Sequence, residues 1–304
     1  MTHHTATRFS HKIPGPRVIG DILFTFAFEK FTKFNRKRLA RSDRPKTMFV
    51  NVADHVGARV VMRGAYDGYR LEALHELLVD QRSRTQQSGG TALDIGANIG
   101  NHALAFSRIF SRTLCFEPVP CIFDVLNANL RLNSATNVES HNVGLSQTSG
   151  RFPFQFKPNA LGEGSITDES DRNASMSIDV RVGDEEVSRH ISDDERIEFV
   201  KIDVEGHEPQ VLLGLKKTLI RHRPIVWFEA HGRAAAEDCI APLVEAGYEH
   251  FYIFGSEAEQ KGETLKGLLA RSRGMEITLS RLDRPPLDLK YMNVIASVVP
   301  LEDV

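Results

Sequence analysis

A short turn between a predicted strand and a predicted helix carries the first residues that could do chemistry: Asp94-Ile95-Gly96-Ala97-Asn98-Ile99-Gly100. Gly96 and Gly100 allow a tight bend and a close backbone approach to a ligand, and the helix that follows offers free N–H groups at its positive end. A carboxylate at Asp94 suits a ligand with an amino group or a sulfonium cation and would repel a pyrophosphate. The GxxxG spacing also differs from the GxGxxG of dinucleotide sites. The turn therefore favours an adenosyl amino acid, S-adenosylmethionine, over a dinucleotide.

A second acid, Glu117, ends the next predicted strand in Phe116-Glu117-Pro118. A carboxylate at this place can accept hydrogen bonds from both hydroxyl groups of a ribose, as in nucleotide sites. The third strand ends near Asn142, which either bonds the adenine edge or caps the turn. The residues that we predict to bind the cofactor are Asp94, Gly96, Ala97, Asn98, Gly100, Glu117, Pro118, Asn142 and Val143.

A charged block follows the strand predicted over residues 198–203 and reads Val204-Glu205-Gly206-His207-Glu208. Lys201 and Asp203 share one face of the strand because side chains alternate along it. An alcohol that accepts a methyl group must lose its proton, so a nearby carboxylate would act as general base. Asp203 and Glu205 are the first candidates. Glu208 lies in the first turn of the next helix, where we expect it to cap the helix, and we expect His207 to lie at the surface or behind the site.

Another strand ends in Trp227-Phe228-Glu229-Ala230-His231, which places Glu229 and His231 at the same edge of the sheet. With Asp203 and Glu205 they form either an acidic metal site or a hydrogen-bonded polar rim. The rim is favoured because no ligand spacing here is diagnostic of a metal, so we predict no metal ligands and leave a divalent metal open. The predicted catalytic residues are Asp203, Glu205, Lys201 and Glu229.

These motifs resemble the FkbM family of class I methyltransferases over residues 64–253. The resemblance rests on four blocks: residues 94–100, 116–118, 127–133 and 199–208. It implies S-adenosylmethionine as cofactor and a seven-stranded sheet with one antiparallel strand. It also implies O-methylation of a hydroxyl group on a sugar, a glycolipid or a hydroxylated secondary metabolite.

The elements that must position these residues alternate between strand-like and helix-like segments, which is typical of a mostly parallel sheet with helices on both faces. The expected fold is therefore α/β and Rossmann-like. Two alternating runs within residues 150–190 predict an inserted hairpin, and residues 291–298 predict a final strand. The expected segments are 68–82, 91–95, 99–110, 113–117, 120–132, 138–143, 198–203, 208–221, 225–230, 234–246 and 248–254. We assign residues 64–304 to the methyltransferase domain.

Residues 1–63 form an N-terminal extension by this interpretation. Val18–Phe34 has apolar residues at helical spacing and is followed by a basic run, while residues 48–62 predict a pair of short strands. The arm suits packing on the catalytic domain or on a second copy. Peripheral contact with an anionic membrane on the cytoplasmic face is the sharper alternative.

The composition excludes several classes of protein. The 304 residues include 38 basic and 40 acidic ones, so the strong positive field of a nucleic-acid binder is missing and a small-molecule or glycan acceptor fits better. Three cysteines without a CxxC pair indicate no disulfide framework and a cytoplasmic location. No apolar run approaches the about 20 residues that span a bilayer.

Two other functions remain as alternatives. An NAD(P)-dependent oxidoreductase or epimerase would use the same type of sheet, but Asp94 and the missing third glycine disfavour it. A non-catalytic scaffold that binds the cofactor is the second, because fold does not dictate function.

Overall fold

The computed structural model describes residues 47–52, 54–85, 89–157, 160–167, 174, 176–255, 278–282 and 292–301. All of them belong to the second of two compact units into which the chain divides, Pro45–Val304. The predicted arm over Val18–Phe34 and its basic run lie outside the described residues. The domain boundary predicted between residues 63 and 64 stays a prediction. Among the helices that the structure describes, none is long and apolar enough to cross a membrane.

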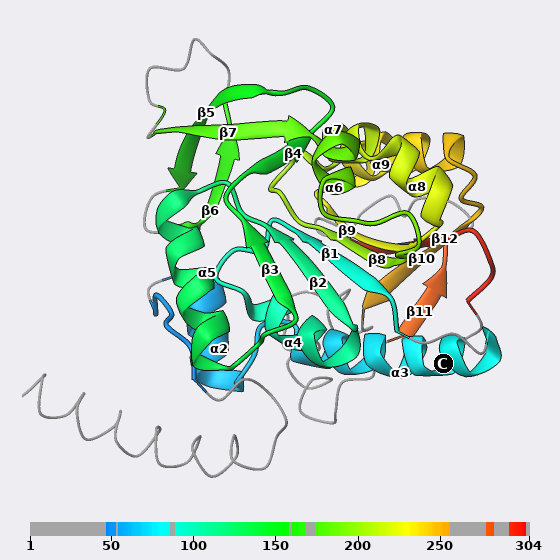
Figure 1. The fold of residues 1–304 in the computed structure, drawn as a ribbon, viewed down its shortest axis with the longest axis horizontal. Helices are drawn as coiled ribbons and strands as arrows, with labels where there is room; N and C mark the ends of the chain where they lie inside the picture. Colours follow the sequence, from blue (N-terminus) through cyan, green and yellow to red (C-terminus); the bar gives the residue numbers. More distant parts are fainter. Residues whose placement is uncertain are drawn as a thin grey trace, which may run out of the picture. The chain divides into compact units, whose positions relative to one another are not determined.

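The centre of the unit is a mixed eight-stranded sheet (Figure 1). In spatial order its strands are β11 (Thr278–Arg281), β10 (His250–Gly255), β12 (Met292–Ser297), β9 (Ile225–Ala230), β8 (Ile197–Ile202), β1 (Thr91–Ile95), β2 (Arg112–Phe116) and β3 (Val138–His141). Strand β12 is antiparallel to both of its neighbours, and β11 is antiparallel to β10.

The predicted Rossmann-like α/β fold is confirmed, and the expected count of seven strands with one antiparallel is corrected to eight with two. The additional strand, β11, pairs with the outer edge of β10. It has only four residues, too few for a hydrophobic period to reveal it in the sequence. The predicted final strand over residues 291–298 is present as β12.

Two layers of helices cover the sheet. One face carries α3 (Gly68–Thr85), α4 (Asn101–Ile109) and α5 (Pro120–Leu132), and the other carries α6 (Gly183–Ser188), α7 (Glu208–Gly214), α8 (Lys216–His222) and α9 (Arg233–Glu245). The helix predicted over residues 208–221 is therefore two helices, divided at Leu215.

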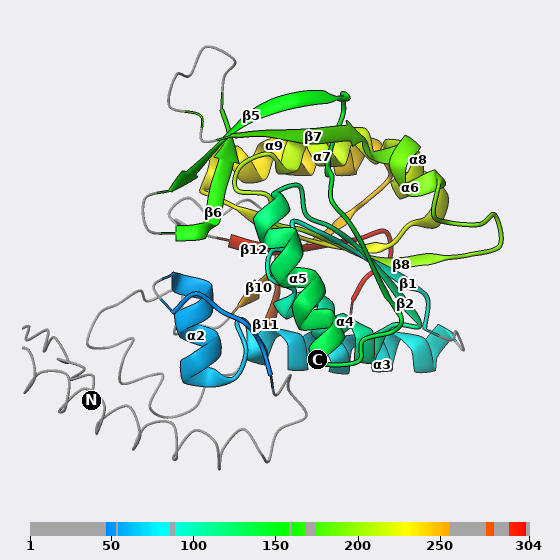
Figure 2. The ribbon, with the colours of Figure 1, turned by 60° about the vertical axis from the view of Figure 1, so that its left-hand side comes forward.

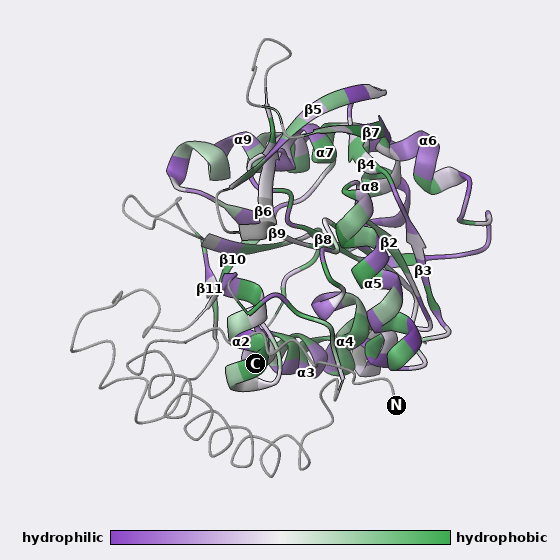
Figure 3. Cartoon of the chain, turned by 90° about the vertical axis from the view of Figure 1, so that its left-hand side faces the viewer, coloured by the Kyte–Doolittle hydropathy of each residue, from purple (hydrophilic) through white to green (hydrophobic). Residues whose placement is uncertain are grey.

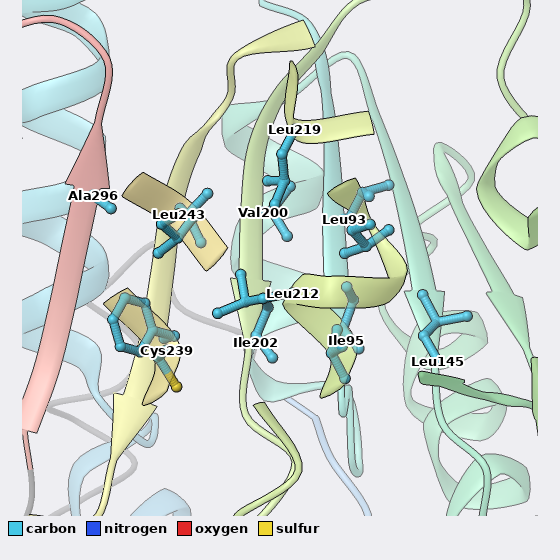
Figure 4. Close-up of a cluster of buried hydrophobic side chains, with 14 of the residues drawn as sticks. Leu93, Ile95, Leu145, Val200, Ile202, Leu212, Leu219, Cys239, Leu243 and Ala296 are labelled. Carbon is cyan, nitrogen blue, oxygen red and sulfur yellow. The ribbon is translucent and has the colours of Figure 1, made fainter. Parts of the chain in front are cut away.

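Buried side chains from both layers explain why the central strands are apolar on both faces. Leu212, Leu219 and Leu243 pack from the helices onto Leu93 and Val200 of the sheet (Figure 4). On the opposite face, a set from α3 and α4 packs on Phe199 and Trp227. The short helix α6 is coloured mostly hydrophilic, whereas the central strands are mainly hydrophobic (Figure 3).

The predicted hairpin within residues 150–190 is part of a separate four-stranded sheet (Figure 2). Its order is β4 (Gly144–Ser146), β7 (Met176–Val182), β5 (Gly150–Lys157) and β6 (Ala160–Ile166). The two runs expected to pair do so as β5 and β7, in antiparallel register. Two further strands extend the pair on either side, and the inner face packs on Val119 and Ile122 beside the start of α5.

The strand pair predicted over residues 48–62 is wrong, because this segment contains the helix α2 (His55–Arg63). The alternation of apolar and polar residues over this segment suggested strands. The helix instead begins at Asp54, whose carboxylate accepts a hydrogen bond from the Gly57 amide at 2.6 Å, and ends at Gly64 in the left-handed conformation. These caps override the weak preference of the side chains for strands.

Candidate functional site

The turn after β1 is built from backbone geometry. Gly96 has a φ of +79°, and a Cβ atom at this position would lie 1.9 Å from the carbonyl oxygen of Asp203. The amides of Gly96 and Ala97 both donate to the carbonyl of Phe116, at 2.9 and 3.1 Å. Gly100 caps the start of α4 with a φ of +89°, a conformation that favours glycine, and a Cβ there would lie 2.7 Å from the Cδ1 atom of Leu126. The turn is therefore tied to the neighbouring strand ends and requires glycine at both ends.

Glu117 lies directly beside this turn and is buried. Its two carboxylate oxygens accept hydrogen bonds from the backbone amides of Asn98 and Val119, each at 2.9 Å. Burial outweighs these bonds and raises the pKa of Glu117 to about 7. Each oxygen keeps acceptor capacity for one hydroxyl group, so the residue fits the ribose role predicted for it. Asn98 reaches its position with a φ of +50°.

The residues predicted at the adenine end have different surroundings. The exposed Asn142 donates from its side-chain amide to the carbonyl of Glu117 at 2.9 Å. This bond favours the capping alternative of the two predicted for Asn142. Val143 is 3% exposed and packs in the hydrophobic core, and Pro118 lies half-buried between Glu117 and the start of α5. Contact of these residues with a cofactor remains a prediction.

Asp94 is completely buried in β1, directly beside Lys201 of β8 in the parallel register. The Lys201 ammonium lies 3.7 Å from the Asp94 carboxylate and 3.2 Å from that of Asp203. Among the described residues, neither oxygen of Asp94 has a hydrogen-bond partner. Burial opposes the charge of Lys201, but the two carboxylates raise its pKa above the usual value. The negative charge of Asp94 is thus already balanced within the chain in part.

The ends of β8 and β9 place two acids next to each other. Ile202 pairs with Phe228, so Asp203 and Glu229 are neighbours one residue further along, on strands about 4.8 Å apart. Burial first, and the neighbouring carboxylates of Asp203 and other acids next, raise the pKa of Glu229 to about 8. The structure therefore brings three of the four predicted catalytic residues together, namely Lys201, Asp203 and Glu229.

The loop after Asp203 is strained. Glu205, the fourth predicted catalytic residue, has a φ of +55°, and Gly206 follows with +100°. The carboxylate of Glu208 accepts hydrogen bonds from the amides of Val204 and Gly206, at 3.0 Å each. Glu208 thus holds the turn before α7 rather than the first amides of the helix, which the sequence predicts it to cap. His207 is half-buried and bonds Ser146 of the second sheet at 2.9 Å.

Tyr66 and Asp67, which were not identified from the sequence, lie near the acids Asp203 and Glu229 at the ends of β8 and β9. The side chain of Asn101, at the start of α4, bonds both the amide and the carbonyl of Tyr66 at 2.9 Å. Burial raises the pKa of the Tyr66 phenol, and the charges of Asp67, Glu229 and Asp203 add to the rise. These influences place Tyr66 near the ends of β8 and β9.

Asp67 holds the same segment in place. It has a φ of +51°, forms an ion pair with Arg70 and lies 3.7 Å from the Nε2 atom of His102. Burial alone would raise its pKa, but His102 and Arg70 outweigh burial and lower it to about 2. No motif or spacing in the sequence links Asp67 to Asp203 or Glu229, so the sequence alone does not reveal that these residues lie close together.

His231 is exposed just beyond β9. Within the part of the chain that the structure describes, no group of three or more His, Cys, Asp or Glu side chains is arranged to hold a metal ion. The three described cysteines are free, and Cys115 and Cys239 are buried.

A family model and several related proteins all identify the chain as a methyltransferase. The sequence model described as "Methyltransferase FkbM domain" matches residues 94–262, more than half of the chain. Methyltransferase sdnD from Sordaria araneosa is 31% identical over 215 residues, which cover 59% of this chain and 80% of that protein. The hexuronic acid methyltransferase AglP from Haloferax volcanii is 34% identical over 50% of this chain, and the match spans 61% of that protein.

Among solved structures, a methyltransferase FkbM from Methylobacillus flagellatus is similar at 18% identity with a TM-score of 0.43. The match covers 69% of this chain and 43% of that one. At this level of similarity, the fold of the present chain is established by its own strand order and helix layers.

Proposed function

The chain belongs to the FkbM family of methyltransferases, and we propose that it methylates a hydroxyl group of a sugar or another hydroxylated metabolite. The observation that carries this proposal is the pair of neighbouring acids Asp203 and Glu229, beside the turn that ends β1. A general base works best when its pKa lies near the working pH. Glu229, with a pKa of about 8, meets this requirement.

The residues of the β1 turn fit S-adenosylmethionine, the methyl donor of class I methyltransferases. Gly96 provides a cradle that any side chain would fill, and Glu117 retains acceptor capacity for the ribose. The carboxylate of Asp94, buried and without a hydrogen-bond partner among the described residues, fits the positive charge of the cofactor. S-adenosylmethionine, when bound, supplies an electrophilic methyl group.

Glu229 would accept the proton of the acceptor hydroxyl as the new C–O bond forms and the C–S bond breaks, with the bonding electrons passing to sulfur. Lys201 holds Asp203 at 3.2 Å, which fixes this carboxylate next to Glu229. Such a base is worth about 10²–10⁴-fold in rate. Alignment of donor and acceptor supplies a larger part, up to about 7–11 kcal/mol.

The relatives support a hydroxylated acceptor, since one of them is named for methylation of a hexuronic acid. A divalent metal bound by the same carboxylates is the alternative way to acidify the hydroxyl. Turnover in the presence of a chelator separates the two, because activity that persists unchanged requires the metal-free route.

The first test is a thermal-shift comparison of the full chain with adenosylhomocysteine and with NAD. A ligand at about 100 times its Kd stabilises the folded state by about 2.7 kcal/mol. We expect adenosylhomocysteine alone to stabilise the protein, and stabilisation by NAD alone would contradict the proposal. Mass spectrometry of hydroxylated acceptors after incubation with S-adenosylmethionine should then show the gain of one methyl group.

A further inference from the structure

The loop between β8 and α7 is fixed at its first residue by the turn after β1. The Asp203 amide donates to the carbonyl of Ile95 at 3.0 Å, and the Asp203 carbonyl oxygen lies directly against Gly96. The chain then passes through Glu205 with a φ of +55° and Gly206 with a φ of +100°. Residues with side chains rarely adopt such a backbone, and it persists only where the surroundings hold the segment in place.

His207 fixes the last residue of this loop. Its Nε2 atom shares a hydrogen bond of 2.9 Å with the Oγ atom of Ser146, and Ser146 is buried. Burial lowers the pKa of His207 below its usual value, so the ring is neutral above pH 7 and bonds the hydroxyl group without a charge. Breaking a buried bond of this kind is costly, because the remaining partner is left unsatisfied.

Ser146 belongs to the second, four-stranded sheet, so the bond connects that sheet to the loop. Ser146 is the last residue of β4, which packs against α7 (Figure 1). A Cβ atom at Gly214 would lie 2.0 Å from the carbonyl oxygen of Ser146. Positions 207 and 214 are about two helical turns apart and lie on one face of α7. Both ends of α7 therefore contact the same serine.

The second sheet also contacts the turn after β1. Val180 of β7 and Val119 belong to one hydrophobic cluster, and Ile99 of the turn packs against it. The Val119 amide in turn donates to the carboxylate of Glu117 at 2.9 Å. The second sheet thus contacts both the proposed cofactor turn and the loop that follows Asp203.

We propose that His207 and Ser146 are positioning residues for methyl transfer, because their hydrogen bond holds the loop after β8 and so keeps the carboxylates at the strand ends facing the methyl group of the bound cofactor. The inference rests on the proposed function and assigns part of its geometry to the second sheet. Neither residue touches the reacting atoms. They act through Asp203, the first residue of the loop, and through its neighbour Glu229.

The test measures the affinity of the full chain for sinefungin and for adenosylhomocysteine by calorimetric titration at pH 8. Sinefungin carries an ammonium group in place of the transferable methyl group, so its affinity reports how Asp203 and Glu229 are oriented. Adenosylhomocysteine has no group at that place. We expect the parent protein to bind sinefungin at least about tenfold more tightly, through a charge-assisted contact.

Ser146→Ala and His207→Leu should each reduce this ratio of affinities at least about threefold, because the loop loses its anchor. Affinity for adenosylhomocysteine should stay within about twofold, since the turn after β1 keeps its own hydrogen bonds. The double variant should lose no more than either single variant, because both changes remove the same bond. His207→Gln should retain the ratio, since its amide can bond the serine hydroxyl.

His222→Leu is the matched control. His222 is also half-buried, and its Nδ1 atom accepts a hydrogen bond from the Ile197 amide at 3.3 Å, at the opposite end of β8. The ratio should not change in this variant. A loss as large as that in His207→Leu would assign the effect to general stability and overturn the inference.

The remaining outcomes separate this inference from the proposed function. A parent protein that prefers sinefungin, with the same preference in Ser146→Ala and His207→Leu, overturns the inference alone. An equal loss of affinity for both ligands does so too, because it reflects a purely structural role. Failure of the parent protein to bind either ligand, or to prefer sinefungin, contradicts the proposed function and the inference together.

Discussion

The turn after β1 and the ends of β8 and β9 lie side by side but are constructed differently. In the turn, backbone amides meet carbonyl and carboxylate oxygens at 2.9–3.1 Å, and glycines with positive φ make the geometry. At the ends of β8 and β9, Asp203 and Glu229 are adjacent like charges with one buried lysine nearby. The first region is shaped by backbone hydrogen bonds, whereas the second places like charges next to each other.

This difference assigns cofactor binding to the turn after β1 and proton transfer to the ends of β8 and β9. A turn that is held by backbone hydrogen bonds keeps its shape and provides a rigid binding surface for a cofactor. At the ends of β8 and β9, burial first and the neighbouring carboxylates next raise the pKa of Glu229 toward the working pH. The comparison predicts that substitutions in the first region change affinity or stability, while replacing Glu229 in the second changes the rate and its pH dependence.

The substitution Glu229→Gln should have the largest effect, and this effect is on the rate of methyl transfer. The turnover number should fall about 100- to 10,000-fold, because the amide cannot accept the hydroxyl proton. Affinity for adenosylhomocysteine should stay within threefold. In the parent protein, activity should rise as the pH increases through about 8 and Glu229 ionises, and steady-state rates between pH 6 and 9.5 measure this. A pH profile that is unchanged in the variant would remove Glu229 as the base.

Lys201→Met should cost about 3–5 kcal/mol of unfolding free energy, because it leaves the buried Asp94 without its cation. Denaturant unfolding measures the loss. The double variant Lys201→Met with Asp94→Asn should recover most of it, since the buried charge is then absent. If the two losses simply add, Lys201 does not act through Asp94.

Gly96→Ala should destabilise the protein by about 2 kcal/mol more than Gly247→Ala. Both glycines have positive φ, so both variants pay the strain of about 1–2 kcal/mol. Only the Cβ at position 96 would collide with the Asp203 carbonyl, whereas nothing lies within 4 Å of position 247. Equal melting temperatures for the two variants would show that the turn is less rigid than the hydrogen bonds indicate.

The smallest effect concerns Glu117→Gln, for which we expect about a tenfold loss of affinity for adenosylhomocysteine from weaker hydrogen bonds to the ribose. In the parent protein, affinity should also fall as the pH drops below about 7, because Glu117 becomes protonated. Calorimetric titration at pH 5.5, 7 and 8.5 measures both effects. The exposed Glu185 provides a matched control as Glu185→Gln, and a similar loss there would contradict a specific role.

The sequence predicts the β1 turn well because its chemistry is local. Asp94, Gly96 and Gly100 lie within seven residues, and a strand followed by a helix leaves few ways to arrange them. Glu117 could be found by counting to the next strand end. The strand ends at residues 203 and 229 could also be placed at one edge, since parallel strands share their direction.

The remaining part of the site depends on contacts between distant segments. Tyr66 is placed by Asn101, 35 residues later, and no periodicity in the sequence indicates that contact. The ion pair between Lys201 and Asp94 could not be predicted either, because it depends on the register of two strands that are far apart in the chain. The helix α2 was missed although its signals are local, because the alternating pattern of residues 48–62 was given more weight than the capping residues Asp54 and Gly64.

The position of β12 has a consequence for how the protein is made. This strand lies between β9 and β10 but comes from residues 292–297, later in the chain than both. During synthesis, β9 and β10 leave the ribosome before the strand that joins them. Until it arrives, each presents an unpaired edge beside residues that include Glu229, and such edges invite wrong pairing. The sheet beside Glu229 is therefore complete only after residues 292–297 have been synthesised and have paired with both strands.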